Sequence, residues 1–228
     1  MRVASYNIHD GVGRDGRFDP ARITDILHSL DADLIALQEV TLDHAGDLLE
    51  RLQSATGLSA IDGSLFARGV GRYGNVVLAD PRRVHSNRVH DIAYPGREPR
   101  GVIELELGDR DAPLRVYATH LGLRPAERRA QVRGLLRLID DHAGPALLMG
   151  DLNHPWAWPG LRPLRRAGFR HRAVRGFPTR PFPLLALDRI MARAPARIGR
   201  CWIERNPRTA QASDHYPLLA EVDWPASR

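Results

Sequence analysis

The sequence predicts a fold of the α/β class, with strands and helices mixed in the α+β manner. Short apolar, strand-like segments alternate with amphipathic, helix-like segments, and several strand-like segments follow one another with no helix between them. No repeat or low-complexity linker divides the chain, and 228 residues with 43% hydrophobic content suffice for one sizeable core. We therefore expect one domain that spans residues 1–228.

Eight segments have the length and apolar pattern of β-strands, which is enough for more than one sheet. They cover residues 2–9, 33–40, 73–80, 101–108, 114–121, 145–153, 185–192 and 216–224. Only five residues, "DRDAP", separate the segments 101–108 and 114–121, and this spacing is typical of a hairpin. At least part of the sheet structure is therefore expected to be antiparallel.

Two amphipathic helices are expected to cover the sheets. The first spans residues 20–30, with Asp19 as its N-cap and Pro20 at the first helical position. The second lies near residues 125–142. The apolar residues of each helix share one face: Ile23, Ile26, Leu27 and Leu30 in the first, and Val132, Leu135, Leu136 and Ile139 in the second. The segment 176–187 contains three prolines and predicts a loop, of a length that is often functional.

The net charge of +6 would suit a polyanionic partner, but it carries little weight by itself. All 33 basic residues are arginine, which indicates a compositional bias along the whole chain. Cys201 is the single cysteine, so an internal disulfide and a cysteine-based zinc cluster are excluded. No segment approaches the ~20 apolar residues of a membrane span. A soluble, cytoplasmic protein is expected.

Polar side chains stand near the ends of several apolar strands. Asn7 follows "VASY", Glu39 follows "LIALQ", His120 follows "VYAT", and Asp151 and Asn153 follow "ALLMG". Each residue alone is a common turn or cap residue, and a histidine such as His120 alone is more often part of a core. Asp151 and Asn153 are two apart on an extended segment, so their side chains point to the same side. Several such strand ends together indicate a site.

Two further acidic residues lie close to a histidine or inside an apolar segment. Asp188 stands within the apolar stretch "LALDRIMA", where a carboxylate is costly unless it is paired. Its partner is either the neighbouring Arg189 or a histidine. Asp214 and His215 directly precede the last strand. The combination predicts an imidazole that is oriented by a carboxylate.

Six short motifs, in order between residues 6 and 217, carry a resemblance to a known family. They are "YNIH", "LQEV", "THL", "GDLN", "LDRI" and "SDHYP". The set resembles the endonuclease/exonuclease/phosphatase superfamily, which has the DNase I-like fold. The resemblance implies a four-layered sandwich in which two mostly antiparallel sheets pack face to face between helices. It also implies a phosphoesterase that depends on a divalent metal, Mg²⁺ or Mn²⁺.

The resemblance implies a role for each of the strand-end residues. Glu39 would be the main metal ligand, with Asn7 beside it. Asp151 would orient or deprotonate the attacking water, and Asn153 would hold the phosphate or that water. His120 would be a candidate general acid. Removal of one such donor or base typically lowers the rate on the order of 100-fold or more.

The resemblance gives roles to the C-terminal residues as well. His215, oriented by Asp188 or assisted by Asp214, would contact the phosphate and stabilise its developing charge. Asp214 is a further candidate metal ligand.

The substrate is less well defined by the sequence. Trp156 and Trp158 directly follow "GDLNHP" and could stack on a base or lie at a membrane interface, or they could pack beneath their own loop. Arg100, Arg124 and Arg180 lie near candidate strand ends, and we expect no more than one of them, Arg100 first, to bind the phosphate.

Three functions are therefore considered. We favour cleavage of a nucleic acid, DNA or RNA. The alternative is a phospholipid head group or a small phosphodiester, in a protein that touches the inner membrane face. A binding module without turnover is the third, and it is disfavoured because every residue that the mechanism requires is present. No obligate protein partner is expected.

Overall fold

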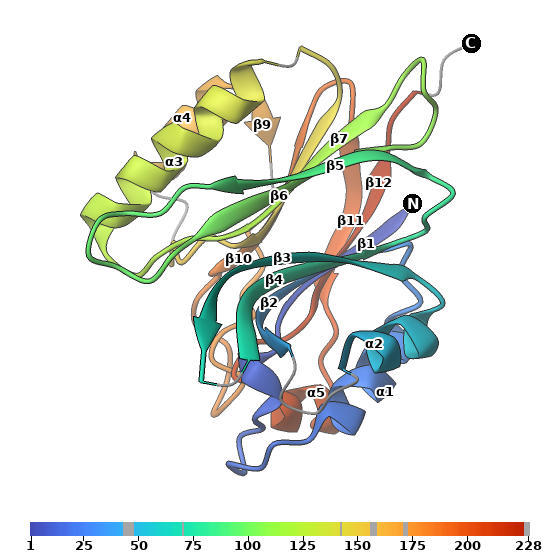
Figure 1. Ribbon diagram of the computed structural model, residues 1–228, viewed down its shortest axis with the longest axis vertical. Helices are drawn as coiled ribbons and strands as arrows, with labels where there is room; N and C mark the ends of the chain where they lie inside the picture. The colour runs from blue at the N-terminus through green and yellow to red at the C-terminus, as the bar shows by residue number, and fades with distance from the viewer. Residues whose placement is uncertain (43–47, 70, 142, 156–158, 171–172, 226–228) are drawn as a thin grey trace.

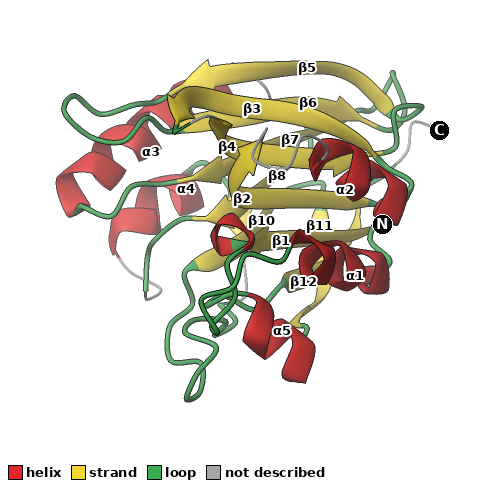
Figure 2. Cartoon of the chain, turned by 60° about the horizontal axis from the view of Figure 1, so that its bottom comes forward, coloured by secondary structure: helices red, strands yellow, loops and turns green. Residues whose placement is uncertain are grey.

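The computed structural model describes residues 1–42, 48–69, 71–141, 143–155, 159–170 and 173–225. Two six-stranded sheets pack face to face, and helices lie on both outer faces (Figure 1). Figure 2 shows the same layers from a second direction. The predicted four-layered sandwich of the DNase I-like kind is confirmed.

The first sheet holds both ends of the chain. It consists of β1 (Arg2–Asn7), β2 (Leu34–Leu42), β3 (Ser59–Arg68), β4 (Gly71–Ala79), β11 (Arg197–Ile203) and β12 (Leu218–Asp223). The strand order is β11-β12-β1-β2-β4-β3. Strands β1 and β2 are parallel, and the other neighbours in this sheet are antiparallel.

The second sheet has the same mixture of pairings. It consists of β5 (Val84–Asp91), β6 (Gly101–Leu107), β7 (Leu114–His120), β8 (Ala146–Asp151), β9 (Phe169–Arg170) and β10 (Asp188–Arg193). The strand order is β5-β6-β7-β8-β10-β9, and only β7 and β8 are parallel. Both sheets are therefore mostly antiparallel, as predicted.

Helices close both outer faces of the sandwich. Those of the first sheet are α1 (Pro20–Leu30), α2 (Leu48–Thr56) and α5 (Pro207–Ala212), and those of the second are α3 (Pro125–Asp140) and α4 (Arg162–Arg166). Short 3-10 turns, η1 (His9–Gly11) and η2 (Pro159–Leu161), complete the elements. One apolar core fills the space between the sheets, and each helical layer covers a further core. Within the described ranges, no helix has both the length and the apolarity to cross a membrane.

All eight predicted strands and both predicted helices are present. The side chain of Asp19 accepts a hydrogen bond from the Arg22 backbone at 3.1 Å, so the predicted N-cap is confirmed. The sequence analysis did not predict β3, β5, β9, β11, α2, α4 and α5. Strand β5 shows the reason, because its sequence "VHSNRVHD" lies at a sheet edge with mostly exposed side chains and no apolar alternation.

The two parallel strand pairs determine where the polar strand ends meet. In the first sheet, Asn7 at the end of β1 lies opposite Gln38 of β2. In the second sheet, His120 at the end of β7 lies opposite Asp151 at the end of β8. Asp188, at the start of the antiparallel β10, also lies opposite Asp151. Polar residues from distant parts of the sequence therefore share one edge of the sandwich.

Candidate active site at the edge of the two sheets

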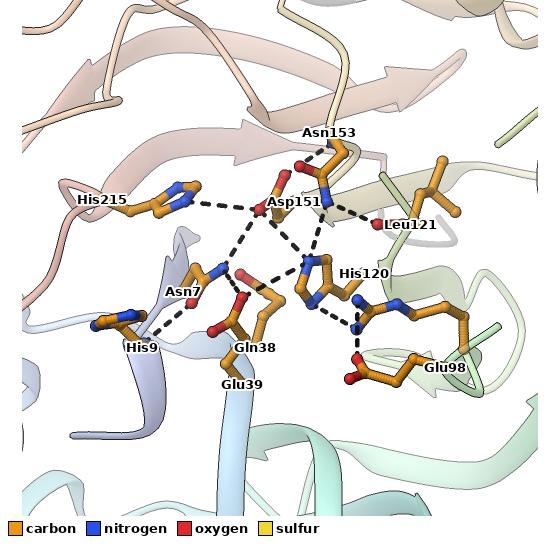
Figure 3. Close-up of polar contacts among 12 residues, drawn as sticks. Asn7, His9, Gln38, Glu39, Glu98, His120, Leu121, Asp151, Asn153 and His215 are labelled. Atoms are coloured by element: carbon orange, nitrogen blue, oxygen red, sulfur yellow. Dashed lines mark hydrogen bonds and ion pairs between the residues drawn. The ribbon is translucent and has the colours of Figure 1, made fainter. Parts of the chain in front are cut away.

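Asn7 connects the two sheets through two carboxylates (Figure 3). Its side-chain nitrogen donates to Glu39 Oε1 at 2.9 Å and to Asp151 Oδ2 at 3.3 Å. Asn7 and Asp151 are almost fully buried, whereas the side chain of Glu39 is 26% exposed. The three residues form a cluster rich in oxygen atoms, and Glu39 is its solvent-accessible member.

Two residues of the site, Glu39 and Asn153, have unusual backbone conformations. Glu39 has φ of 56°, where the register between β2 and β4 shifts between Leu37 and Val40. Such a bulge turns a side chain out of the regular strand pattern. Asn153 has φ of 50°, and its backbone N–H donates to Asp151 Oδ1 at 2.8 Å. Positive φ in a residue with a Cβ is costly and is common at functional sites.

The contacts of His120 place a donor at each ring nitrogen. A guanidinium nitrogen of Arg100 lies 3.1 Å from Nδ1, and arginine can only donate. Asn153 Nδ2, which donates to the Leu121 carbonyl at 2.7 Å, lies 3.1 Å from Nε2. Nε2 is also 3.6 Å from Asp151 Oδ2 and 4.0 Å from Glu39 Oε1. The Arg100 contact favours the neutral ring with its proton on Nε2, directed toward these carboxylates, and the Asn153 contact opposes it.

His215 approaches Asp151 from the opposite side (Figure 3). Its Nδ1–H donates to Asp188 Oδ2 at 2.8 Å, and its Nε2 lies 3.7 Å from Asp151 Oδ2. The predicted pairing of Asp188 with a histidine is thus the geometry observed. The ring of Phe177 packs against His215, with centroids 4.7 Å apart. This imidazole is held by a carboxylate at one nitrogen and by a ring on one face.

Burial and neighbouring charges shift the pKa of three groups in opposite directions. Burial lowers the pKa of His120 well below 6.5, and the charges of Arg100 and His215 add to this effect. Burial also opposes a charge on His215, but the Asp188 carboxylate outweighs it and raises the pKa of His215 to about 10. For Asp151, burial raises the pKa to about 6, and attraction to His215 offsets part of that rise. One histidine is therefore neutral and the other is protonated near neutral pH.

The oxygen groups around Asn7 fit a hard divalent cation. Carboxylate and amide oxygens are the ligands that Mg²⁺ and Mn²⁺ prefer. Glu39 and Asp151 converge on the same amide, and reversal of that amide would present its oxygen in place of its nitrogen, with loss of the hydrogen bond that Oδ1 accepts from the His9 N–H at 3.0 Å. The buried Asp188 Oδ1 also accepts no hydrogen bond from any described residue. The site therefore offers more negative oxygen atoms than its donors satisfy.

A second group of possible ligands lies beside the first. Atoms of Asp151, Asp188 and His215 lie within 4.8 Å of one another and could bind a metal ion. However, His215 Nδ1 already donates to Asp188, which leaves only its Nε2 for an ion, whereas Mg²⁺ and Mn²⁺ prefer oxygen atoms such as those of Glu39 and Asn7. Glu39 and Asn7 are therefore the better ligand pair.

The remaining predicted residues lie outside this central group. Asp214 Oδ1 lies 3.4 Å from the Ser213 hydroxyl oxygen, and the described contacts do not place its carboxylate against Glu39 or Asn7. Arg100 contacts His120 and also Glu98, at 2.9 Å, so its guanidinium is partly engaged. Arg124 and Arg180 are exposed at the periphery. Trp156 and Trp158 lie outside the described residues.

Two further residues, Ser213 and Phe177, contact the site and were not predicted from the sequence. The Ser213 hydroxyl donates to the Asn7 carbonyl at 2.8 Å and accepts from the His215 backbone N–H at 3.1 Å. It therefore links the end of β1 to the segment that precedes β12. Its position in "SDH", two residues before the candidate histidine, was the available signal. Phe177 reaches His215 only through the path of the 176–187 loop, which no local pattern indicates.

A family model described as "Endonuclease/Exonuclease/phosphatase family" matches residues 4–215, which includes every residue of the central group. The chain belongs to the endonuclease/exonuclease/phosphatase family. Members of this family are hydrolases that act on phosphoester bonds. The geometry at the sheet edge is therefore that of a phosphoesterase family member.

Three similar proteins match the chain over almost its whole length. YbhP of Escherichia coli, named an uncharacterized protein, is 31% identical over 253 residues, covering 97% of this chain and 96% of its own. A functionally unknown conserved protein from Enterococcus faecalis has a TM-score of 0.80 at 19% identity, covering 99% of this chain and 100% of its own. The mannosyl-6-phosphatase Bt3783 of Bacteroides thetaiotaomicron has a TM-score of 0.78 at 17% identity, covering 98% and 100%. The last two likenesses concern the fold alone.

Proposed function

We propose that the protein hydrolyses phosphodiesters by attack of water on phosphorus, with the aid of a divalent cation. The observation that carries this proposal is the convergence on Asp151 Oδ2. Asn7 lies 3.3 Å from this atom, His120 3.6 Å and His215 3.7 Å. A carboxylate surrounded by donors on three sides is suited to a reaction in which protons move and negative charge builds up on phosphate oxygens.

Glu39 and Asn7 are the residues that would hold the cation, which we take to be Mg²⁺ or Mn²⁺. When bound, it would supply positive charge next to the phosphate oxygens. Glu39 is accessible from solvent, whereas Asp151 is enclosed. We therefore assign Glu39 as the metal ligand, because an ion can reach it from solvent. We assign Asp151 as the base, because its burial shields it from competing solvent.

The side chains of the second sheet would then act on water and phosphate. Asp151 would accept a proton from the attacking water. His215, kept protonated by Asp188, would donate to a phosphate oxygen, and His120 would present its Nε2–H to the reacting group. Asn153 places the backbone around Asp151 and orients that carboxylate through its N–H. Each donor is fixed before substrate arrives, which is what electrostatic stabilisation requires.

Nucleic acid remains a proposed substrate on the grounds of sequence pattern and a net charge of +6. A lipid phosphodiester is the second proposed substrate. It is favoured by exposed apolar side chains on loops next to the site, such as Leu123 and Phe182.

The first test measures hydrolysis of bis(p-nitrophenyl) phosphate with Mg²⁺, with Mn²⁺ and with a chelator. We expect Glu39→Gln and Asp151→Asn each to lower metal-dependent turnover on the order of 100-fold or more, because each removes a charge that the reaction needs. The matched controls are Glu50→Gln on α2 and Asp25→Asn on α1, which change exposed carboxylates far from the site. Turnover that survives in Asp151→Asn would contradict the assigned base.

A further inference from the structure

Large apolar side chains are exposed mainly next to the active site. Among the described residues, those with large exposed fractions are Phe18, Val89, Leu123, Phe182 and Leu184. Val89 lies on the edge strand β5. The other four lie on loops that leave the edge of the sheets where Asn7, His120 and Asp188 are found. A group of exposed apolar residues around a site, rather than isolated ones, indicates a contact surface.

Leu123 is presented by a rigid loop. It is 71% exposed, the largest value among these side chains. Yet the loop is fixed from below, because the Gly122 N–H donates to Gln131 at 2.8 Å and the guanidinium of Arg128 donates to the carbonyls of Gly122 and Leu123. Gln131 and Arg128 are both buried. The buried side chains of Gln131 and Arg128 thus fix the backbone that exposes Leu123 to solvent.

The segment 176–187 is also a closed and stiff loop. Phe177 and Leu185 bridge its base through backbone hydrogen bonds of 2.7 and 3.1 Å, and three prolines lie between them. The buried Thr179 donates through its hydroxyl to the Ser213 carbonyl at 2.9 Å, and Arg180 donates to Gln211 of α5 at 2.8 Å. The tip beyond these ties carries Phe182, which is 54% exposed. Leu184, which is 48% exposed, stands at the base, where its N–H donates to the Phe177 carbonyl at 2.9 Å.

The two loops flank the site on opposite sides. Leu123 follows His120 by three residues, and Phe177 of the second loop packs on His215. Both loops leave the same edge of the second sheet, because β7 ends and β10 begins at the register of Asp151. We call residues 121–124 and 176–187 the docking loops. They contain the exposed Arg124 and Arg180 and no acidic residue.

We propose that the docking loops place the active site on an anionic lipid bilayer. Aliphatic and aromatic side chains without polar atoms gain free energy in the acyl region, and arginines beside them meet lipid phosphates. Because both loops are already fixed, little conformational entropy is lost on binding. Binding to the bilayer does not depend on the proposed hydrolysis. Only the step after binding, attack on a phosphoester at the membrane surface, rests on the proposed function.

The test measures binding without turnover. Purified full-length protein is sedimented with vesicles of phosphatidylcholine alone and of equimolar phosphatidylcholine and phosphatidylglycerol. We expect binding to the anionic vesicles only, and a loss of about tenfold in affinity for Leu123→Ser and for Phe182→Ser, since each removes one inserting side chain. The matched control is Val89→Ser, which removes an exposed apolar side chain from β5 and should bind as wild type does.

Three results would overturn the proposal. One is equal binding of wild type and Phe182→Ser, and another is an equal loss in Val89→Ser. The third is a loss of duplex DNA binding in the docking-loop variants without a loss of vesicle binding, which would make these residues nucleic acid contacts. Since no divalent metal is added, the vesicle phosphodiesters are not turned over in this assay, and a failure here leaves the hydrolysis measured with bis(p-nitrophenyl) phosphate as a separate result.

Discussion

Arg100 shows how one residue can set the chemistry of another. The sequence suggested that it binds phosphate directly, but its guanidinium lies 3.1 Å from His120 Nδ1 and 2.9 Å from Glu98. Because arginine cannot accept a hydrogen bond, this contact favours the proton of His120 on Nε2, facing Asp151, against the opposing contact of Asn153 Nδ2 with the same nitrogen. Arg100 is therefore a positioning residue for His120.

We expect Arg100→Leu to lower turnover by roughly tenfold, because the ring loses the donor that favours its Nε2–H tautomer. Nitrogen NMR of labelled histidine should show the Nε2–H form of His120 in wild type and a mixture of both tautomers in the variant. Arg100→Lys, which still donates, should restore the signal. Arg97→Leu, an exposed residue on the same loop, is the control and should change neither reading. An unchanged tautomer in Arg100→Leu would refute this role.

His154 makes the stability of the folded state depend on pH. It is buried, and burial together with the charges of Arg128 and Arg189 lowers its pKa from 6.5 to about 4. The unfolded chain therefore binds more protons than the folded one between these values, so this contribution to stability is complete above pH 6.5 and decreases as the pH falls toward 4.

We expect His154 to account for a loss of about 2 kcal/mol in the free energy of unfolding between about pH 7 and about pH 5. Urea denaturation at both pH values measures it, and His154→Gln should show a smaller difference than wild type. His28→Gln, which changes an exposed histidine on α1, is the control. The prediction fails if His154→Gln and wild type lose the same free energy.

At the scale of elements, the close contact of β7 and β8 depends on a glycine. Gly150 has φ of 139°, and a Cβ there would collide with the Thr119 carbonyl oxygen of the neighbouring strand. This contact lies one residue before Asp151, so it places the carboxylate as well as the strand. The motif "GDLN" thus needs its glycine for packing and its other residues for chemistry.

We expect Gly150→Ala to lower the free energy of unfolding by about 2 kcal/mol or more, since the backbone must shift to accept a methyl group. Thermal and chemical denaturation measure the change. Gly16→Ala is the control, because Gly16 also has a positive φ, of 73°, but nothing lies within 4 Å of its added Cβ. A similar cost in both variants would show that backbone conformation, not the contact with Thr119, sets the requirement.

The elements also show how far the sequence could lead. Central strands such as β8 are buried throughout and mostly apolar and were predicted, whereas β5 and the two-residue β9 have no pattern to detect. For the same reason, site residues at the ends of central strands, such as Asp151, could be predicted. Arg100 and Phe177 act through loops whose path depends on tertiary packing, so their contacts with the two histidines could not be predicted.

At the scale of the whole molecule, the candidate active site joins the two sheets. Asn7 and Glu39 come from the first sheet and Asp151 from the second, and the Asn7 amide reaches both. Two carboxylates that converge on one amide repel each other, and a cation between them would relieve this repulsion. Metal binding should therefore stabilise the packing of the sheets.

We expect Mg²⁺ or Mn²⁺ to raise the unfolding temperature of the wild type, with a gain of about 2.7 kcal/mol once the ion reaches roughly 100 times its dissociation constant. Differential scanning calorimetry across a metal titration measures this without any substrate. Glu39→Gln should lose most of the shift and Glu50→Gln should keep it. An equal shift in both variants would place the ion elsewhere.

The pairing of β1 with β12 has a consequence for how the protein is made. The N-terminal amine donates to the Val222 carbonyl at 3.0 Å across 221 residues of sequence, and Ser213 holds the Asn7 carbonyl across 206. During synthesis, β1 must therefore wait, with an unpaired edge, for the much later β12. The candidate active site can thus be assembled only after translation has passed residue 215, because His215 belongs to it.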